Sequence, residues 1–340
     1  MIVVLLIGAG VYYLSSSKTS MNTSASIGSA IIPGLLESVN NISQIQISKA
    51  GGETVATLKA SGNGWMLEER NGYPADLSKI RTVALALAQA EIVEEKTSNP
   101  ELYSKLGVKS IDNTDAQGMQ VQVNFGNQSK ALIIGNPGPQ LNKNRYVRLT
   151  DSKTSWLVDQ KIDVKHDTAY WLQKDLFSVE PDEILKVVIT MPDESQLIIK
   201  NDDPQEDIFV VANLSDPDSQ VVQAELDQVT NALSSFQLLD VTRTESFIGH
   251  QPVMHVDYLL KQGVNIKLIA YEVDKDHFMA IEIDEADPDL QIEIDETARN
   301  YITDLQKKTT GWIFKIPNVT YDAMYKREPD VLAITEDQLN

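Results

Sequence analysis

The sequence of 340 residues contains no cysteine. Without a thiol the chain cannot form a disulfide, a thiolate zinc site, an iron–sulfur cluster or a cysteine nucleophile, and it cannot carry a lipid on an N-terminal cysteine. Basic residues are also scarce, with 29 Lys and Arg against 49 Asp and Glu, which gives a formal net charge of -20. Because an acidic surface repels phosphate backbones, nucleic-acid binding is not expected.

Familiar catalytic and nucleotide-binding motifs are missing as well. The sequence has no Gly-x-x-x-x-Gly-Lys phosphate loop, no Gly-x-Ser-x-Gly nucleophile elbow and no His-Glu-x-x-His metal motif. Only four histidines occur, and His250 and His255 flank a predicted transition from loop to strand. We therefore predict no catalytic residue, no cofactor and no metal ligand, and we expect that the protein is not an enzyme.

The N-terminus is an uninterrupted apolar run, residues 1–14. At about 1.5 Å per residue a helix of this length reaches about 21 Å, less than the hydrocarbon core of about 30 Å. Three interpretations of the run are open. It is a membrane anchor whose first turns lie upstream, the apolar region of a signal peptide, or a buried first strand. We favour the anchor, because Tyr12 and Tyr13 suit a membrane interface and no basic leader precedes the run.

The next segment, residues 15–34, is rich in serine and threonine and is predicted to be a flexible polar tether. A large acidic body follows, and residues 334–340 are predicted to be a tail. An anchor, a tether and an acidic body together predict a protein of the bacterial inner membrane whose soluble body lies in the periplasm.

The first part of the body combines short strand patterns with one helix pattern. Residues 45–47 and 54–58 alternate apolar and polar side chains, and residues 65–67 begin another strand after a glycine-containing turn, as expected of an antiparallel meander. Asp76 then offers an N-cap for a helix over 77–90. Its apolar positions are Leu77, Ile80, Ala84 and Leu87. The elements expected after it are strands at 120–125, 131–134, 146–149 and 156–158 and a short helix at 167–176.

The same pattern returns about 146 residues later. Its expected strands are 186–190, 196–200, 208–211, 255–260, 265–271, 278–283 and 312–316. Its helix is predicted over 222–236, with Asp216 or Ser219 as the cap. So long an offset exceeds solenoid periods, and the copies are therefore whole domains. We predict an α+β fold of two tandem, repeat-like domains, 35–180 and 181–333, each an antiparallel sheet with a packed helix.

A candidate interaction face lies in the first of these domains. Arginine and aromatic residues anchor many protein interfaces, and several occur there in turn-rich segments. The candidates are Arg70, Tyr73, Tyr103, Arg145, Tyr146, Arg148 and Trp171. Core packing and turn formation are the alternative explanation for the same residues.

An acidic motif, Glu282-Ile283-Asp284-Glu285, recurs as Glu293-Ile294-Asp295-Glu296. Clustered carboxylates can hold Ca²⁺ or Mg²⁺, but this spacing does not match the Asp-x-Asp-x-Asp-Gly loop. A solvated hairpin edge explains the alternation of isoleucine with acidic residues. A divalent-cation-binding module and a carboxylate-dependent hydrolase of envelope glycans are the alternative functions for these acids.

Several short motifs lie in the first domain: Gly64-Trp65, Gly72-Tyr73-Pro74-Ala75-Asp76, Asn99 to Val108, Tyr146-Val147-Arg148, Trp156-Leu157-Val158 and Trp171-Leu172. In these motifs the chain resembles a bacterial family known only as domain of unknown function 4340. The resemblance implies a membrane-anchored extracytoplasmic protein, encoded beside the permease or auxiliary subunits of an ABC transporter similar to gliding-motility systems. It brings no catalytic residues. We therefore expect a non-enzymatic accessory or binding protein that works with an ABC-type transporter.

Overall fold

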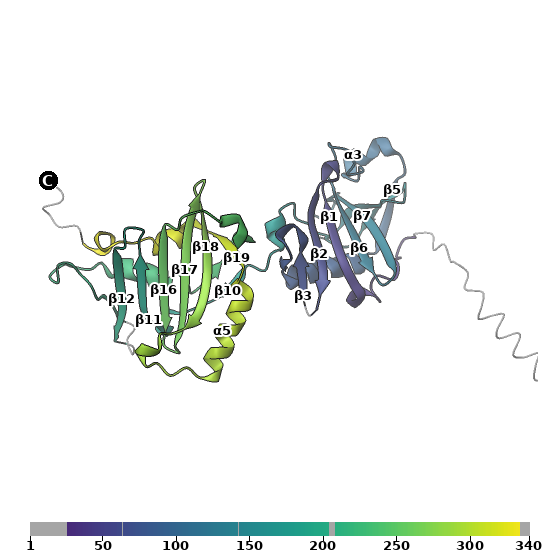
Figure 1. Ribbon diagram of the computed structural model, residues 1–340. Helices are drawn as coiled ribbons and strands as arrows, with labels where there is room; N and C mark the ends of the chain where they lie inside the picture. The colour runs from purple at the N-terminus through teal and green to yellow at the C-terminus, as the bar shows by residue number, and fades with distance from the viewer. Residues whose placement is uncertain (1–25, 63, 142, 204–207, 334–340) are drawn as a thin grey trace, which may run out of the picture. The chain divides into compact units, whose positions relative to one another are not determined.

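The computed structural model describes residues 26–333 except residues 63, 142 and 204–207 (Figure 1). Within these ranges the chain forms two large antiparallel sheets and five α-helices, so the predicted α+β class is confirmed. The predicted apolar anchor, most of the predicted tether and the predicted tail lie outside the described residues. None of the described helices is both long enough and apolar enough to cross a membrane.

The first sheet has nine strands in the order β4-β3-β2-β1-β6-β7-β8-β9-β5. Its strands are β1 (Ile42–Ser48), β2 (Thr54–Ser61), β3 (Gly64–Leu67), β4 (Tyr73–Pro74), β5 (Ile92–Thr97), β6 (Met119–Phe125), β7 (Gln128–Pro137), β8 (Arg145–Leu149) and β9 (Ser155–Val158). Helix α2 (Leu77–Ala88) connects β4 with β5, and the short α3 (Tyr103–Leu106) precedes β6.

The second sheet has eight strands in the order β13-β12-β11-β16-β17-β18-β19-β15. Its strands are β11 (Ile184–Thr190), β12 (Gln196–Asp203), β13 (Ile208–Val211), β15 (Asp240–Arg243), β16 (Met254–Leu260), β17 (Val264–Val273), β18 (Asp276–Glu285) and β19 (Trp312–Ile316). Its helices are α4 (Gln223–Asn231), α5 (Glu296–Thr309) and α6 (Asn318–Met324). A separate pair is formed by β10 (Asp175–Phe177) and β14 (Phe236–Gln237).

The two sheets share one strand order. When β1, β2 and β3 are matched with β11, β12 and β13, and β5 to β9 with β15 to β19, the two orders agree except for the additional β4. In the first copy α2 lies between β3 and β5 along the chain, and in the second copy α4 lies between β13 and β15. The architecture is therefore consistent with the predicted internal repeat.

Residue-level contacts repeat at the predicted offset. Ala75, just before α2, forms an isolated bridge with Leu172, and Val221, 146 residues later, forms one with Leu332. The buried positions of the two helices correspond in the same way: Ile80, Val83 and Leu87 of α2 match Leu226 and Val229 of α4 and Leu233 just after it. Because a helix has to bury one stripe against its sheet, the same apolar spacing indicates the same packing.

The structure corrects the end of the predicted tether. Ile31, Ile32 and Leu35 are buried, and the backbone at residues 28–31 is hydrogen-bonded to residues 90–92. The isolated bridge Ala30↔Glu91 belongs to this contact. The segment around Ile31 and Ile32 is thus packed, because these two isoleucines fill a core that the serine-rich composition of the segment conceals.

Two helix predictions also differ from the structure. Helix α4 begins at Gln223, and its N-cap Val222 contributes no side-chain bond, whereas Asp216 and Ser219 form a separate turn upstream. The reason is that Val222 N–H donates to the Val331 carbonyl, which keeps the segment before the helix extended. The predicted helix at 167–176 is one 3₁₀ turn, Thr168–Trp171, followed by β10.

By contacts, the described residues fall into two compact units. One contains residues 26–42, 48–53 and 83–164, and the other contains residues 43–47, 54–82 and 165–333. The predicted domain bounds, 35–180 and 181–333, stay a prediction.

The predicted N-cap of α2 is confirmed, and it leads to a first test. Asp76 Oδ1 accepts from the backbone N–H of Ser78 at 2.9 Å and of Lys79 at 3.2 Å. We expect Asp76→Ala to lower the free energy of unfolding by about 1 kcal/mol at pH 7, because the first-turn N–H groups lose their acceptor. Asp76→Asn keeps the acceptor and should lose less. Urea unfolding of both variants measures the difference.

The deficit of Asp76→Ala should depend on pH. Burial acts to raise the pKa of Asp76, but hydrogen bonds from Lys79 and from the Ser78 backbone outweigh it, so this pKa lies below its ordinary value. A carboxylate with a lowered folded-state pKa stabilises the protein above about pH 4, and the effect is lost as the pH falls through the folded-state pKa. A deficit that is the same at pH 7 and pH 2 would contradict this assignment.

Candidate functional site

The two faces of the eight-stranded sheet carry different side chains. Along β16 the even-numbered residues are buried, and the Tyr258 hydroxyl donates to the Val229 carbonyl of α4 at 2.8 Å. That burial raises the pKa of Tyr258. His255 and Asp257 of β16, and Val188 of β11, are only half-buried. One face thus packs against α4, and we call the other the outer face.

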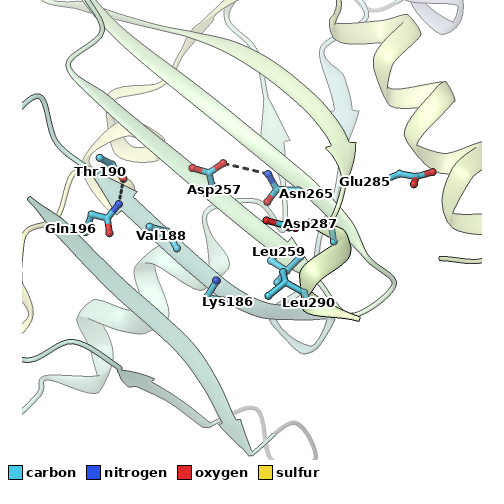
Figure 2. Close-up of a pocket in the computed structure, with 11 residues that line it drawn as sticks. Lys186, Val188, Thr190, Gln196, Asp257, Leu259, Asn265, Glu285, Asp287 and Leu290 are labelled. Carbon is cyan, nitrogen blue, oxygen red and sulfur yellow. Dashed lines mark hydrogen bonds between the residues drawn. The ribbon is translucent and has the colours of Figure 1, made fainter. Parts of the chain in front are cut away.

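The outer face contains a hollow of about 300 Å³ (Figure 2). Residues from β11, β12, β16, β17, the end of β18 and the segment after it line the hollow. They are Lys186, Val188, Thr190, Gln196, Asp257, Leu259, Asn265, Glu285, Ala286, Asp287 and Leu290. We call this site the outer hollow.

Strand register places the floor of the outer hollow. Leu259 of β16 lies opposite Lys186 of β11 on one side and opposite Asn265 of β17 on the other. In the next row Val188 lies opposite Asp257. Because directly opposed side chains on one face are close neighbours, three strands bring an ammonium, a carboxylate, an amide and two apolar side chains together.

The rim of the outer hollow comes from the chain that follows β18. Ala286 N–H donates to the Gly263 carbonyl at 2.8 Å, which ties this segment to the turn between β16 and β17. Asp287 then caps a 3₁₀ turn, Pro288–Leu290, by accepting from the Asp289 N–H at 2.9 Å. These contacts hold Asp287 and Leu290 beside the sheet, as Figure 2 shows.

Several polar groups in the outer hollow bond to one another. Asn265 Nδ2 donates to Asp257 Oδ1 at 3.3 Å, and Gln196 Nε2 donates to Thr190 Oγ1 at 3.3 Å. The ammonium of Lys186 makes no hydrogen bond or ion pair within the described part of the chain. The outer hollow therefore contains an ammonium without a direct ion-pair partner, carboxylates elsewhere in its lining, and an apolar floor. Such a lining suits a group that carries both charge and apolar surface.

The candidate interaction residues Tyr73 and Trp171 are buried. Tyr73 is 2% exposed, and its ring packs edge-on against Trp312 with centroids 5.0 Å apart. Burial raises the pKa of Tyr73. Trp171 is fully buried. Both side chains belong to the interior of one compact unit.

Tyr103 and Arg148 are buried as well and brace the loop around α3. Arg148 Nε donates to the Val108 carbonyl at 3.0 Å, and Nη1 donates to the Ser152 carbonyl at 2.9 Å. The guanidinium lies over the Tyr103 ring, 4.7 Å from its centroid, and the Tyr103 hydroxyl donates to the Lys153 carbonyl. Burial lowers the pKa of Arg148.

The remaining three candidates are half-buried. Arg70 forms a bidentate ion pair with Asp240, with Nε–Oδ1 at 2.6 Å and Nη2–Oδ2 at 2.8 Å, and the hydrogen bonds to Asp240 raise the pKa of Arg70. Burial lowers the pKa of Arg145, and Tyr146 packs against the small core around Tyr103. Four of the seven candidates are buried, so they form no single exposed surface; whether any of them binds a partner stays a prediction.

The acidic motif is divided between two elements. Glu282 and Asp284 are exposed on β18, whereas Asp295 caps α5 by accepting from the Ala298 N–H at 2.8 Å. The expectation of a hairpin edge is therefore wrong for Glu293 to Glu296, since these residues lead into a helix. No group of three His, Asp or Glu side chains that could hold a metal ion occurs among the described residues.

Sequence reasoning did not identify the outer hollow. Its signal is weak: Lys186 and Asp257 are single charges within otherwise apolar strands. A charge at such a position is equally expected on any solvated sheet face. Only the register of the strands shows that these side chains are neighbours.

Comparison with known proteins gives one match. The model of a family described as a domain of unknown function (DUF4340) matches residues 65–262, more than half of the chain. No curated protein and no solved structure matches significantly. The matched segment runs from β3 in the first sheet to the end of β16 in the second, so it includes parts of both copies of the repeat. The chain therefore belongs to the DUF4340 family.

Proposed function

We propose that this protein is a non-enzymatic accessory or binding protein and that it holds a partner in the outer hollow. The observation that carries the proposal is the uncompensated Lys186 ammonium beside Asp257 and Asp287, over the apolar floor of Val188 and Leu259. A partner that places a carboxylate at Lys186 and a basic group at the aspartates would be electrostatically complementary.

The composition of the outer hollow favours binding over catalysis. Nucleophilic catalysis requires a hydroxyl or thiol next to a base, and acid–base catalysis requires a proton-transfer group aimed at the substrate. Thr190, the hydroxyl residue that lines this site, is hydrogen-bonded to the Gln196 amide, which is not a base. The three carboxylates of the site already have partners: Asp257 accepts from Asn265, Glu285 from Arg299, and Asp287 from the Asp289 backbone. Binding requires only complementary shape and charge.

The location and the partner class are part of the same proposal. The apolar run 1–14 supports a tether to the bacterial inner membrane with the body in the periplasm. Family resemblance supports a permease or auxiliary subunit of an ABC-type transporter as the partner. The outer hollow would then be the surface that this subunit contacts.

Affinity purification of the full chain from its native membranes, followed by quantitative mass spectrometry, tests the proposal. The test variant combines Lys186→Glu with Asp257→Lys, which inverts the charges and leaves the net charge unchanged. The matched control combines Glu101→Lys with Lys105→Glu, two exposed residues far along the sequence from the outer hollow. We expect transporter subunits with the wild type and the control, and at least about tenfold less with the test variant, because like charges would then face one another across the contact.

Equal recovery with the test variant would show that the outer hollow is not the contact surface. If no transporter subunit is recovered with any form and the purified protein cleaves envelope glycans, the enzymatic alternative replaces the proposal.

A further inference from the structure

The two copies of the repeat differ at their last hairpin. In the first copy, β8 and β9 pair from Arg145↔Val158 to Arg148↔Ser155, and a short turn joins them. In the second copy, β18 pairs with β19 only from His277↔Ile316 to Ala280↔Ile313. Residues 286–311, which include α5, are inserted between these two strands. Both hairpins thus pair four residues, but β18 continues beyond its pairs as residues 281–285, whereas β8 ends at Leu149.

This half of β18, residues 281–285, pairs with β17 on one side. On its other side no described residue continues the ladder, and α5 lies alongside (Figure 1). Gln306 Nε2 of α5 donates to the Ile283 carbonyl at 2.7 Å. Because the N–H and C=O of one residue point to the same side in antiparallel pairing, and successive residues alternate, Ile281 and Ile283 direct their backbone groups away from β17.

A groove of about 330 Å³ runs along this strand edge. Its walls are residues 280–284 of β18, Gln306 and Thr309 of α5, Thr244, and the segment 310–312 that leads into β19. We call it the β18 groove. The side chains of Ile281 and Ile283 are buried, whereas those of Glu282 and Asp284 are exposed. Apart from the Ile283 carbonyl, which accepts from Gln306, the edge therefore offers strand backbone without a partner strand among the described residues, with an acidic side-chain row on one face.

We propose that an extended peptide segment of a partner protein adds to β18 in the β18 groove as an antiparallel strand, in line with β19. An exposed strand edge recognises another backbone through main-chain hydrogen bonds, and pockets for alternate side chains give specificity. The position of β19 supports this occupant, because it already pairs with residues 277–280 on the same side of β18 and an added strand would continue that ladder.

Charge defines the sequence of that segment. Residues of an added strand would lie alternately opposite Glu282 and Asp284 on one face and opposite Ile281 and Ile283 on the other. On the existing neighbour β17, the residue opposite Glu282 is Lys267, with Nζ–Oε2 at 4.0 Å. The partner segment is therefore one that alternates basic and apolar residues.

Binding of an intact strand requires that Gln306 release the Ile283 carbonyl. Removal of this competing donor should favour the peptide, so Gln306→Ala is expected to bind about twofold to tenfold more tightly than the wild type, the equivalent of one hydrogen bond.

The test is isothermal titration of the full chain with acetyl-Arg-Val-Lys-Val-Arg-amide. Two control peptides accompany it: the same residues in blocks, Arg-Lys-Arg-Val-Val, and the alternating peptide N-methylated on the residues whose N–H groups would face β18. We expect the alternating peptide to bind and both controls to bind at least tenfold more weakly, because one lacks alternation and the other lacks backbone donors. This comparison uses the wild-type protein, so no variant has to fold.

Two double variants map the contact to the β18 groove. Glu282→Lys with Asp284→Lys should weaken the alternating peptide at least tenfold. Glu37→Lys with Glu101→Lys changes the net charge equally at exposed positions elsewhere and should change binding less than threefold. Equal binding of the N-methylated peptide, equal loss in both double variants, or no binding of the alternating peptide at millimolar concentration would each overturn the proposal.

Discussion

Trp171→Ala should lower the free energy of unfolding by about 3–5 kcal/mol, the largest single effect that we expect in this chain. Trp171 is fully buried in the 3₁₀ turn Thr168–Trp171, and its carbonyl accepts from the Asp76 N–H at the start of α2. Alanine would leave a large cavity at this contact, and the surrounding side chains would close it only in part. Urea unfolding followed by far-ultraviolet circular dichroism measures the loss.

Trp171→Phe is the informative comparison for this residue. The indole Nε1 is buried and has no hydrogen-bond partner among the described residues. Since an unsatisfied buried donor costs about 1–3 kcal/mol, the phenyl ring removes that penalty while keeping most of the packing. Trp171→Phe should therefore lose clearly less stability than Trp171→Ala. Equal losses would show that the phenyl ring does not retain the packing of the indole at this position.

A control for both variants is Ile248→Ala. Ile248 is 83% exposed, so its truncation should change the free energy of unfolding by no more than about 0.5 kcal/mol. A loss comparable with that of Trp171→Ala would mean that Ile248 is buried in the protein in solution.

Arg148→Ala should lower the free energy of unfolding by about 3 kcal/mol. Removal of the guanidinium leaves the Val108 and Ser152 carbonyls without their donor, at about 1–3 kcal/mol for each buried group, and removes the contact with the Tyr103 ring. Thermal and urea unfolding measure this loss.

Arg148→Lys separates charge from geometry. A lysine keeps the positive charge but presents one ammonium in place of a planar fork, so it cannot reach both carbonyls in the same directions. We expect a stability between those of the wild type and Arg148→Ala. If Arg148→Ala instead keeps full stability and loses the recovery of a partner protein, the residue belongs to an interaction face, as the sequence suggested.

Local periodicity is what the sequence determined well. The alternation along β6 and β16 and the apolar stripe of α2 follow from how side chains project from a strand or a helix, and this can be read from neighbouring residues. The offset of about 146 residues between Ala75 and Val221 is likewise visible in the sequence, because two copies of one fold must bury the same positions.

Edge elements were harder to predict. Strand β5 contains Glu94, Glu95 and Lys96, which interrupt the alternation of apolar and polar residues. The sheet tolerates these charges because β5 is an edge strand, with a neighbouring strand on one side only. Helix α5 has a clear buried stripe of Ala298, Ile302 and Leu305, but the acidic motif before it favoured a strand. In the sequence its N-cap, Asp295, is indistinguishable from a member of the acidic motif.

Only the tertiary structure decided which side chains are buried and which meet. Arg148 and Tyr73 have the composition of an interface, and their burial depends on residues far away in sequence, such as Trp312 against Tyr73. The outer hollow depends on the register of β11, β16 and β17, where a shift of one residue would turn Asp257 to the opposite face. The β18 groove depends on where α5 packs, since β19 pairs with only half of β18 and Gln306 then reaches Ile283. Such contacts between distant segments leave no pattern in neighbouring residues, so the sequence determined the elements and the tertiary structure determined the sites.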